Sequence, residues 1–171
     1  MPNIIRPIRI VDNTAYVTLT QGYKAIIDIS DVDKISNFNW HACVKDHAVY
    51  AFRGGQLNKI KFRIPMHHVI LPLIDGYEVD HINLDTLDNR FSNLRYATRQ
   101  QNASNRGLPK NNSTGIKGVG WHKASKKWRA TITCGQKSFH IGLFENQTDA
   151  VIAYNDAAKR LHGEFARLNL I

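Results

Sequence analysis

Cysteine is scarce in this sequence: only Cys43 and Cys134 occur, and they form no CxxC pair. Two such distant cysteines exclude a four-cysteine zinc site and give no disulfide framework of the kind that stabilises small secreted proteins. The sequence also lacks any run of about 18 apolar residues, and residues 1–30 contain no long apolar stretch behind a basic start. We therefore expect no membrane span and no signal peptide, and a reducing, intracellular setting.

Acidic side chains are also in the minority. The chain has 23 Lys and Arg against 14 Asp and Glu, which gives a formal net charge of +9 and a pI near 9.7. This excess favours a polyanionic partner, and nucleic acid is the first candidate. A hydrophobic content of 43% in 171 residues excludes a disordered chain and suffices for one ordinary domain or a few small modules.

The charge is unevenly divided along the chain. Residues 1–64 carry 9 basic and 5 acidic side chains, residues 65–105 carry 3 and 5, and residues 106–171 carry 11 and 4. Basic segments therefore flank an acidic centre. Either the acidic groups share a purpose, or surface charge is simply scattered unevenly.

The first 64 residues have a pattern typical of β structure. Apolar and polar residues alternate over 4–29, which predicts two or three antiparallel strands. A short helix is expected after Ser30. A second β pattern covers 44–64, and the pair Gly54-Gly55 is expected to interrupt it.

Short elements and polar loops are expected to alternate over residues 65–106. The stretch PMHHVILPL predicts one or two helical turns that end at Pro72. A short strand should end near Ile82, an Asp- and Asn-rich loop follows, and 94–97 is a second strand. Thr98 is a good helix N-cap, because its hydroxyl can accept a hydrogen bond from an unpaired backbone N–H. The predicted order is strand, loop, strand, helix.

Three polar side chains of this region can converge if the elements fold back on one another. Asp80 on the first strand and Asn102 in the helix can then face a common point, with His81 beside them. Carboxylate and amide oxygens suit a hard divalent cation such as Mg²⁺, which polarises a phosphodiester, and a histidine with a pKa of about 6.5 can accept a proton from water. The alternative is a solvated loop whose Asp and Asn side chains only stabilise turns.

The central stretch also resembles a known family. The runs VDHIN, LDNR, SNLR, AT and QN, at their spacings within 65–106, are similar to the core motif of the HNH (His-Asn-His) homing endonucleases of phages and mobile introns. That family has the ββα-metal fold and hydrolyses phosphodiester bonds in DNA with a divalent metal. The resemblance implies the same fold and activity here.

The resemblance further implies roles for individual residues. His81 would be the general base that activates water, and Asp80 and Asn102 would be the metal ligands. Mg²⁺ is the expected ion, with Mn²⁺ as the alternative. Asn93 matches the middle Asn of the motif, whose amide positions the loop and the histidine. The family name has His where this chain has Asn102, which leaves the metal preference open.

Three more residues of this region are interpreted as structural. Asp88 and Asn89, in the run LDNR, match family residues, and we expect them to brace the loop through Asx-type hydrogen bonds. His67 lies where the family often has a histidine before a short helix. We expect it to pack rather than to react.

Residues 115–171 predict a three-stranded antiparallel sheet packed on one helix. Breaks at 123–127 and at Cys134-Gly135 separate the strands, and the helix should be capped by Thr148 and ended by Gly163. Trp128 and Phe139 are assigned to the core. The helical residues expected to cover the apolar face of the sheet recur at helical spacing: Ala150, Val151, Tyr154, Ala157, Ala158 and Leu161.

This C-terminal module resembles the plant ethylene-response-factor (APETALA-type) DNA-binding domain. The runs KGVGW, KKWRATI, HIGLF and AVIAYNDAAKRLHGEFARLN carry the resemblance. Plant members have arginine on the first strand where this chain has Gly120 and His122, so no plant target sequence can be transferred. Without the resemblance, the outer face would be only a solvated basic surface. The positions that the resemblance nominates for DNA contact are Lys117, Trp121, His122, Arg129, Thr131 and Thr133, with Lys123, Lys126, Lys127 and Lys137 on phosphates.

The sequence thus predicts an α+β protein built of small modules. They are a β-rich segment over 1–64, an HNH ββα-metal core over 65–106, a linker over 107–114 and an ethylene-response-factor-type (ERF-type) DNA-binding domain over 115–171. The expected function is a metal-dependent, site-specific HNH homing-type endonuclease acting on double-stranded DNA. We expect no membrane or protein partner, and a gene of a phage or mobile element expressed in the cytoplasm of a bacterial host.

Two other functions fit the composition. A non-catalytic DNA-binding regulator would have a decayed central motif, but decay is not expected to leave Asp80, His81, Asn93 and Asn102 all in place. An RNA-binding protein fits the charge, although the specific sheet-and-helix module does not favour it.

Overall fold

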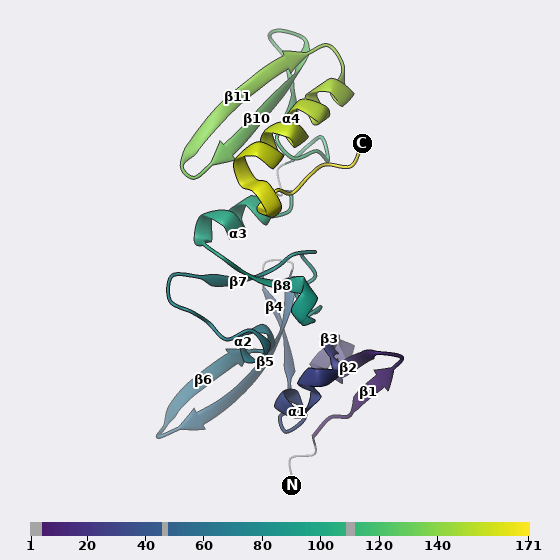
Figure 1. The fold of residues 1–171 in the computed structure, drawn as a ribbon, viewed down its shortest axis with the longest axis vertical. Coiled ribbons are helices and arrows are strands. Elements are labelled where there is room, and N and C mark those ends of the chain that lie inside the picture. The colour runs from purple at the N-terminus through teal and green to yellow at the C-terminus, as the bar shows by residue number, and fades with distance from the viewer. Residues whose placement is uncertain (1–4, 46–47, 109–111) are drawn as a thin grey trace. The chain divides into compact units, whose positions relative to one another are not determined.

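The computed structural model describes residues 5–45, 48–108 and 112–171. The remaining positions, which include 46–47 of the predicted β pattern and 109–111 of the predicted linker, lie outside the described residues. The backbone divides into two compact units, Met1–Ala97 and Thr98–Ile171 (Figure 1). Within the described residues, four α-helices and four small antiparallel sheets confirm the α+β class.

The first sheet of the first unit contains β1 (Ile8–Val11), β2 (Thr14–Thr18) and β3 (Lys24–Asp28), paired antiparallel in that order. The three strands confirm the prediction from the alternating pattern. Every second residue of β2 and β3 faces the core, because side chains alternate across a strand. These core residues are Ala15, Val17, Ala25 and Ile27.

The second sheet contains β4 (His41–Lys45), β5 (Ala48–Leu57) and β6 (Ile60–Pro65), in the order β4-β5-β6. The expected interruption at Gly54-Gly55 was wrong, because both glycines lie inside β5. The β5–β6 turn instead uses Asn58 and Lys59, which both have positive φ. Gly55 has a packing reason to be there, since a Cβ at this position would collide with the ring of Phe62 on β6.

Two short helices and a two-stranded sheet complete the first unit. Helix α1 (Val32–Ile35) confirms the helix expected after Ser30, and α2 (Met66–Ile70) confirms the helical turns expected before Pro72. Strands β7 (Glu78–His81) and β8 (Leu94–Ala97) pair antiparallel, close to the predicted positions.

One hydrophobic core runs through the first unit. It joins side chains of both three-stranded sheets, α1, α2, β7 and β8, with Trp40, Ile27, Ile35 and Met66 fully buried. Burying each such side chain contributes about 1.5–3 kcal/mol to folding. The β7–β8 pair therefore shares its support with the N-terminal β-rich segment.

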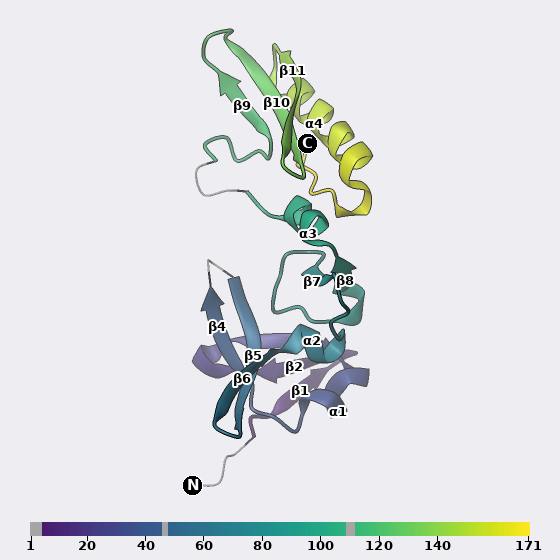
Figure 2. The same cartoon turned by 90° about the vertical axis from the view of Figure 1, so that its left-hand side faces the viewer.

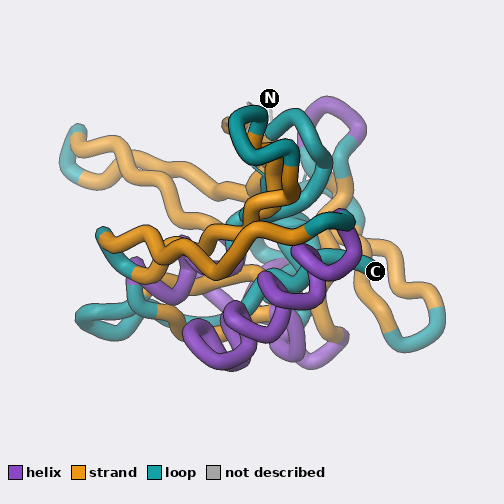
Figure 3. The backbone as a smooth tube through the Cα atoms, turned by 90° about the horizontal axis from the view of Figure 1, so that it is seen from above, coloured by secondary structure: helices purple, strands orange, loops and turns teal. Residues whose placement is uncertain are grey.

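The second unit begins with α3 (Arg99–Asn105), which Thr98 caps as predicted: Thr98 and Gln101 form a reciprocal capping box. Strands β9 (Val119–His122), β10 (Lys127–Cys134) and β11 (Lys137–Phe144) form a sheet in the order β11-β10-β9. Helix α4 (Gln147–His162) lies along this sheet (Figure 2) and is the longest helix of the described residues (Figure 3). None of the helices in the described part of the chain has the length and apolar character needed to cross a membrane.

Details of the second unit correct three expectations. The N-cap of α4 is Asn146, whose Oδ1 accepts from Asp149 N at 2.8 Å, and not Thr148. Leu161 is 46% exposed in the last turn of α4, and Phe139 is 45% exposed because β11 is an edge strand. The other apolar residues predicted on α4 are buried, Trp128 packs against them, and Gly163 ends the helix with φ 55°.

Candidate functional site

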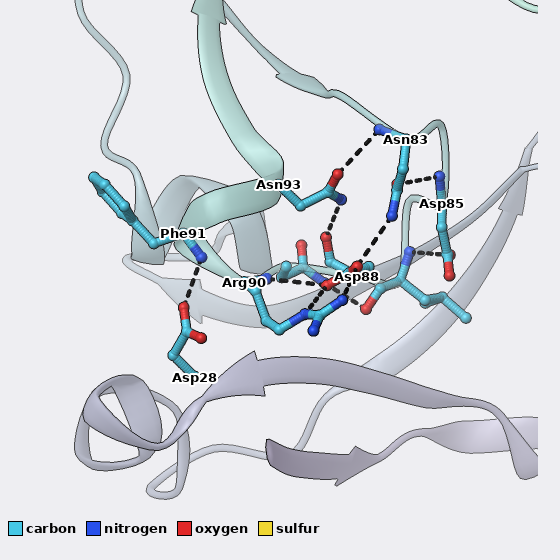
Figure 4. Close-up of polar contacts among 9 residues, drawn as sticks. Asp28, Asn83, Asp85, Asp88, Arg90, Phe91 and Asn93 are labelled. Atoms are coloured by element: carbon cyan, nitrogen blue, oxygen red, sulfur yellow. Dashed lines mark hydrogen bonds and ion pairs between the residues drawn. The ribbon is translucent and has the colours of Figure 1, made fainter. Parts of the chain in front are cut away.

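The loop that joins β7 to β8 is organised around the carboxylate of Asp88. Arg90 donates from Nε to Oδ1 at 2.8 Å and from Nη2 to Oδ2 at 2.7 Å, and Asn83 Nδ2 donates to Oδ2 at 3.0 Å (Figure 4). The hydrogen bonds from Arg90 hold the pKa of Asp88 below its usual range, although burial opposes them. The buried Asp88 therefore braces the loop, as its place in the motif suggested.

Asn93 links the two ends of the same loop. Its Nδ2 donates to the backbone oxygen of Asp88 at 2.7 Å, and its Oδ1 accepts from the backbone N–H of Asn83 at 3.0 Å (Figure 4). Between these points, Asn83 Oδ1 accepts from Asp85 N at 2.8 Å and Asp85 Oδ1 accepts from Leu87 N at 3.0 Å. Turn chemistry of the Asp and Asn side chains thus fixes the loop in one conformation.

The loop is also anchored to the N-terminal sheets. Ile26 on β3 donates to Leu87 O and accepts from Asn89 N, both at 2.8 Å. Two further hydrogen bonds join Thr86 Oγ1 to Val49 O at 2.8 Å and Phe91 N to Asp28 Oδ2 at 2.7 Å. Sequence reasoning missed this anchoring, since its partners are far apart in the chain and no local pattern marks them.

His81 is the last residue of β7 and is 5% exposed. Its Nε2 lies 3.3 Å from Oδ1 of Asn89, whose own Nδ2 donates to Leu87 O at 3.1 Å. That second bond fixes the orientation of the amide, so the oxygen faces the imidazole. Because an amide oxygen can only accept, the proton of neutral His81 belongs on Nε2, and the lone pair on Nδ1.

Two other rings surround His81. Its ring centroid lies 5.0 Å from that of His67 and 6.4 Å from that of Tyr50. Burial lowers the pKa of His81, against the hydrogen bond of Asn89 and the charge of Asp80. Burial, together with His81 and His68, lowers the pKa of His67 to about 3. Both buried imidazoles are therefore neutral near neutral pH, the form in which His81 can accept a proton.

Asp80 lies one residue before His81 and is 4% exposed. It pairs across the ladder with Arg95 on β8, whose Nε and Nη2 both lie 2.9 Å from Oδ2. Both of these Arg95 contacts end on the same carboxylate oxygen. Sequence reasoning missed Arg95, although the strand register that aligns residues 80 and 95 could have identified it.

Comparison with known proteins adds an independent finding. Residues 71–104 match a family model described as HNH endonuclease. The chain is 31% identical, over 173 residues, to an uncharacterized HNH endonuclease of Acanthamoeba polyphaga mimivirus, and the match covers 95% of this chain and 84% of that protein. The chain belongs to the HNH endonuclease family. It is also 32% identical to Protein 3.8 of Escherichia phage T7 over 112 residues, which are 62% of this chain and 92% of that protein. No solved structure matches.

The matched segment of this HNH endonuclease contains all four residues predicted to carry the chemistry. Asp80, His81 and Asn93 lie together in the first unit, and Asn102 lies on α3 in the second, where its backbone N–H donates to Thr98 O at 2.9 Å. Within the described ranges, no group of three or more His, Cys, Asp and Glu is placed to hold a metal. Carboxylate and amide oxygens are ligands of the kind that hard divalent ions take in proteins.

The residues nominated for DNA contact lie in the second unit of the endonuclease. Those on its exposed surface are Trp121, Lys123, Lys126, Arg129, Thr133 and Lys137, and those partly buried are Lys117, His122, Lys127 and Thr131. Two of the partly buried side chains have local partners: His122 Nδ1 lies 2.8 Å from Ser125 Oγ, and Lys127 Nζ lies 2.7 Å from Glu145. The nominated surface is thus mostly accessible.

Lys117 differs from the other nominated lysines. Its ammonium donates to Ser104 O at 2.6 Å and to Arg106 O at 2.7 Å, at the C-terminal end of α3. A cation is favourable there, because the last carbonyls of a helix lack partners within it. Burial and the charge of Arg167 lower the pKa of Lys117 to about 8. The side chain therefore caps α3 in the conformation described.

Proposed function

We propose that this HNH endonuclease is a metal-dependent, site-specific enzyme of the homing type that hydrolyses phosphodiester bonds in double-stranded DNA. The observation that carries the proposal is the buried His81 at the end of β7, whose tautomer is set by Asn89 within the segment that matches the family model. A neutral imidazole with a lone pair on Nδ1 is the group that a water-activating base requires.

In the proposed reaction, His81 takes a proton from the water that attacks phosphorus. Asn89 keeps the ring in one orientation, and its oxygen accepts the Nε2 proton, so that neutral His81 offers Nδ1 to the proton of the water. The enclosed surroundings of His81 keep it neutral before the reaction. Positioned proton transfer of this kind typically contributes a factor of about 10²–10⁴ to a rate.

Asp80 and Asn102 are the proposed metal ligands. Mg²⁺ is the ion that their oxygen atoms suit best, with Mn²⁺ as the alternative. When bound, such an ion supplies Lewis acidity toward the phosphodiester and stabilises charge on the leaving oxygen. Arg95 would fix the carboxylate of Asp80 in place from the opposite strand.

Asn93 is proposed to act through the loop and not on the substrate. By joining Asn83 and Asp88, it closes the loop that carries Asn89, and so it holds His81 indirectly. The chain from Asn93 through the loop to Asn89 and His81 lies entirely within the first unit.

The C-terminal module is proposed to bind the DNA. Its resemblance to the ERF-type domain and the exposure of Trp121, Arg129 and Thr133 support this role, with Lys123, Lys126 and Lys137 on phosphates. His122, Lys127 and Thr131 are partly buried and are proposed to contribute at the rim. Lys117 would have to leave Ser104 and Arg106 to reach a phosphate.

A cleavage assay tests the proposal. The purified chain should cut or nick DNA from the region that flanks its own gene, with Mg²⁺ and not with EDTA, and a run-off map of the ends should show one preferred site. His81→Ala should abolish cutting while it leaves binding nearly intact. His41→Ala, a histidine in the exposed part of β4, is the matched control and should cut normally. Specific binding without cleavage by the wild-type chain would overturn the proposal and indicate a DNA-binding regulator.

A further inference from the structure

The β5–β6 hairpin of the first unit extends away from the other elements of that unit (Figure 1). Its two strands pair without interruption from Phe52↔Pro65 to Leu57↔Ile60, and the turn consists of Asn58 and Lys59. The end of the hairpin is therefore a two-stranded ribbon with both faces available for contact.

One face of the ribbon is apolar and exposed. Residues that pair directly across two strands point to the same side, so Leu57 shares a face with Ile60, and Gly55 shares it with Phe62. The exposed fractions are 68% for Leu57, 72% for Ile60 and 40% for Phe62. Such large apolar side chains at the tip of a projecting hairpin are costly to hydrate and suit a partner that buries them.

The charged side chains of the sequence segment around the hairpin are all basic. Residues 48–74 contain four Lys and Arg and no Asp or Glu. Lys59 lies in the turn, and Lys61 and Arg63 point to the face opposite the apolar one, with the Arg63 guanidinium 4.8 Å from the ring centroid of Phe52. At the base of the hairpin, the Arg53 guanidinium lies 3.7 Å from the ring centroid of Phe38, and its buried Nε has no hydrogen-bond partner among the described residues.

We propose that the β5–β6 hairpin is a DNA-deforming arm, which inserts Leu57 and Ile60 into the minor groove of duplex DNA while Lys59 and Lys61 contact the flanking phosphates. Apolar side chains wedged between base steps unstack them and kink the duplex, and basic neighbours supply the attraction to the backbone. The inference rests on the proposed function only in taking DNA as the substrate, and it requires no residue of the cleavage site.

Charge complementarity selects DNA over other partners for this surface. In a symmetric contact, in which the hairpin packs on the hairpin of a second copy, four like charges would face four, which is repulsive at the short distances of an interface. A polyanion with apolar base faces matches both the basic surroundings and the apolar tip of the hairpin. Only the two tip side chains need enter the narrow minor groove, which is about 6 Å wide in B-DNA.

A plasmid topology assay tests the arm separately from cleavage. His81→Ala protein is bound to relaxed closed-circular plasmid in EDTA, a magnesium-independent topoisomerase I is added, and the linking-number distribution is measured after protein removal. The parent should shift the distribution. Adding Leu57→Ser and Ile60→Ser should remove at least two thirds of the shift. Leu73→Ser, which changes an apolar residue 54% exposed in the same unit but off the hairpin, should leave the shift unchanged.

A second pair of substitutions tests the proposed phosphate contacts. Lys59→Gln with Lys61→Gln should reduce the slope of log affinity against log salt by about 2, since each phosphate contact contributes about 0.9. Leu57→Ser with Ile60→Ser should leave that slope unchanged. All variants should have the melting temperature of the parent, because the substituted side chains are exposed. If the double serine variant has a lower melting temperature, Ile60→Ser alone is used in its place.

The outcomes separate the inference from the proposed function. A serine variant that shifts linking number as its parent does would overturn the arm. A parent that sediments as a dimer, with the serine variant as a monomer, would also overturn it and assign the apolar face to a second copy. A wild-type chain that never cuts DNA but still shifts linking number through Leu57 and Ile60 would refute the cleavage proposal and support the arm.

Discussion

The polar side chains of the β7–β8 loop are buried and fixed by hydrogen bonds, whereas those of the outer face of β9–β11 are exposed. In the loop, Asp88, Asn89 and Asn93 are each less than 8% exposed, and several hydrogen bonds fix each side chain. On the outer face of the sheet, the side chains of Arg129 and Thr133 are exposed. The loop is organised before any substrate arrives, as chemistry requires, whereas the sheet keeps side chains that can adapt to a duplex.

The largest effect should come from breaking the organisation of the loop. Asn93→Ala leaves the buried Asp88 O without its side-chain partner, at a cost of about 1–3 kcal/mol, and also removes the acceptor of the part-buried Asn83 N–H. The cleavage rate should fall by about 10³-fold or more, with a lower melting temperature and with DNA affinity nearly unchanged. Asn37→Ala, which removes an exposed amide with one long 3.5 Å bond, is the control and should change neither. Normal cleavage by Asn93→Ala would show that the loop needs no closure.

A smaller effect is expected at Asn89, where the loop touches His81. Asn89→Leu keeps the volume but removes the oxygen that accepts the Nε2 proton, so the imidazole loses its preferred tautomer. The single-turnover cleavage rate should fall by about 30-fold while the Kd for DNA stays constant, and Asn89→Asp, which keeps an acceptor, should recover part of the rate. Equal losses in both variants would mean that Asn89 serves packing alone.

The buried histidines give the first unit a pH-dependent stability. The pKa of His67 is lowered to about 3 in the folded protein from about 6.5 in the unfolded chain, so below pH 6.5 the unfolded chain binds more protons. Stability is therefore full above pH 6.5 and falls as the pH drops toward 3. Between pH 7 and pH 5 the loss should be about 2 kcal/mol, measured by urea unfolding. His67→Leu should flatten that dependence.

The smallest effects should distinguish a basic side chain that contacts DNA from one that caps a helix in the second unit. Arg129→Ala should weaken DNA binding about 3- to 10-fold and lower the salt slope by about 1, without changing the melting temperature. Lys117→Met should instead cost about 1 kcal/mol of stability, because it removes the cap of α3, and should hardly change the slope. If Lys117→Met lowers the slope of log affinity against log salt by about 1, Lys117 contacts DNA instead.

The sequence was most informative where a local pattern decides the structure. The first three strands, the Thr98 cap and the Gly163 helix end follow from alternation, a hydroxyl and a flexible backbone, all of which act within a few residues. Thr148 failed as the cap of α4 because Asn146 lies nearby and its side chain is an equally good cap. Gly54-Gly55 failed as an interruption of the β pattern because glycine also serves close packing, here against Phe62.

The rest of the candidate site depends on contacts that no local pattern encodes. The motif nominated Asp80, His81 and Asn93, but the ion pair with Arg95 follows from strand register, and the Ile26 contacts follow from docking of the loop on β3. The role of Asn89 was also predicted only in part. Its family match suggested loop bracing, whereas the orientation of its amide toward His81 emerges only in three dimensions.

The anchoring of the loop on β3 also implies an order of folding steps. Asp28 and Phe91 are 63 residues apart in the sequence, so the contact closes a long loop of chain and forms slowly compared with local turns. During synthesis the N-terminal sheet leaves the ribosome first, and the later segment must find it. We expect cleavage-competent geometry to arise only after that docking, which leaves a nascent fragment that ends before residue 87 without the framework around His81.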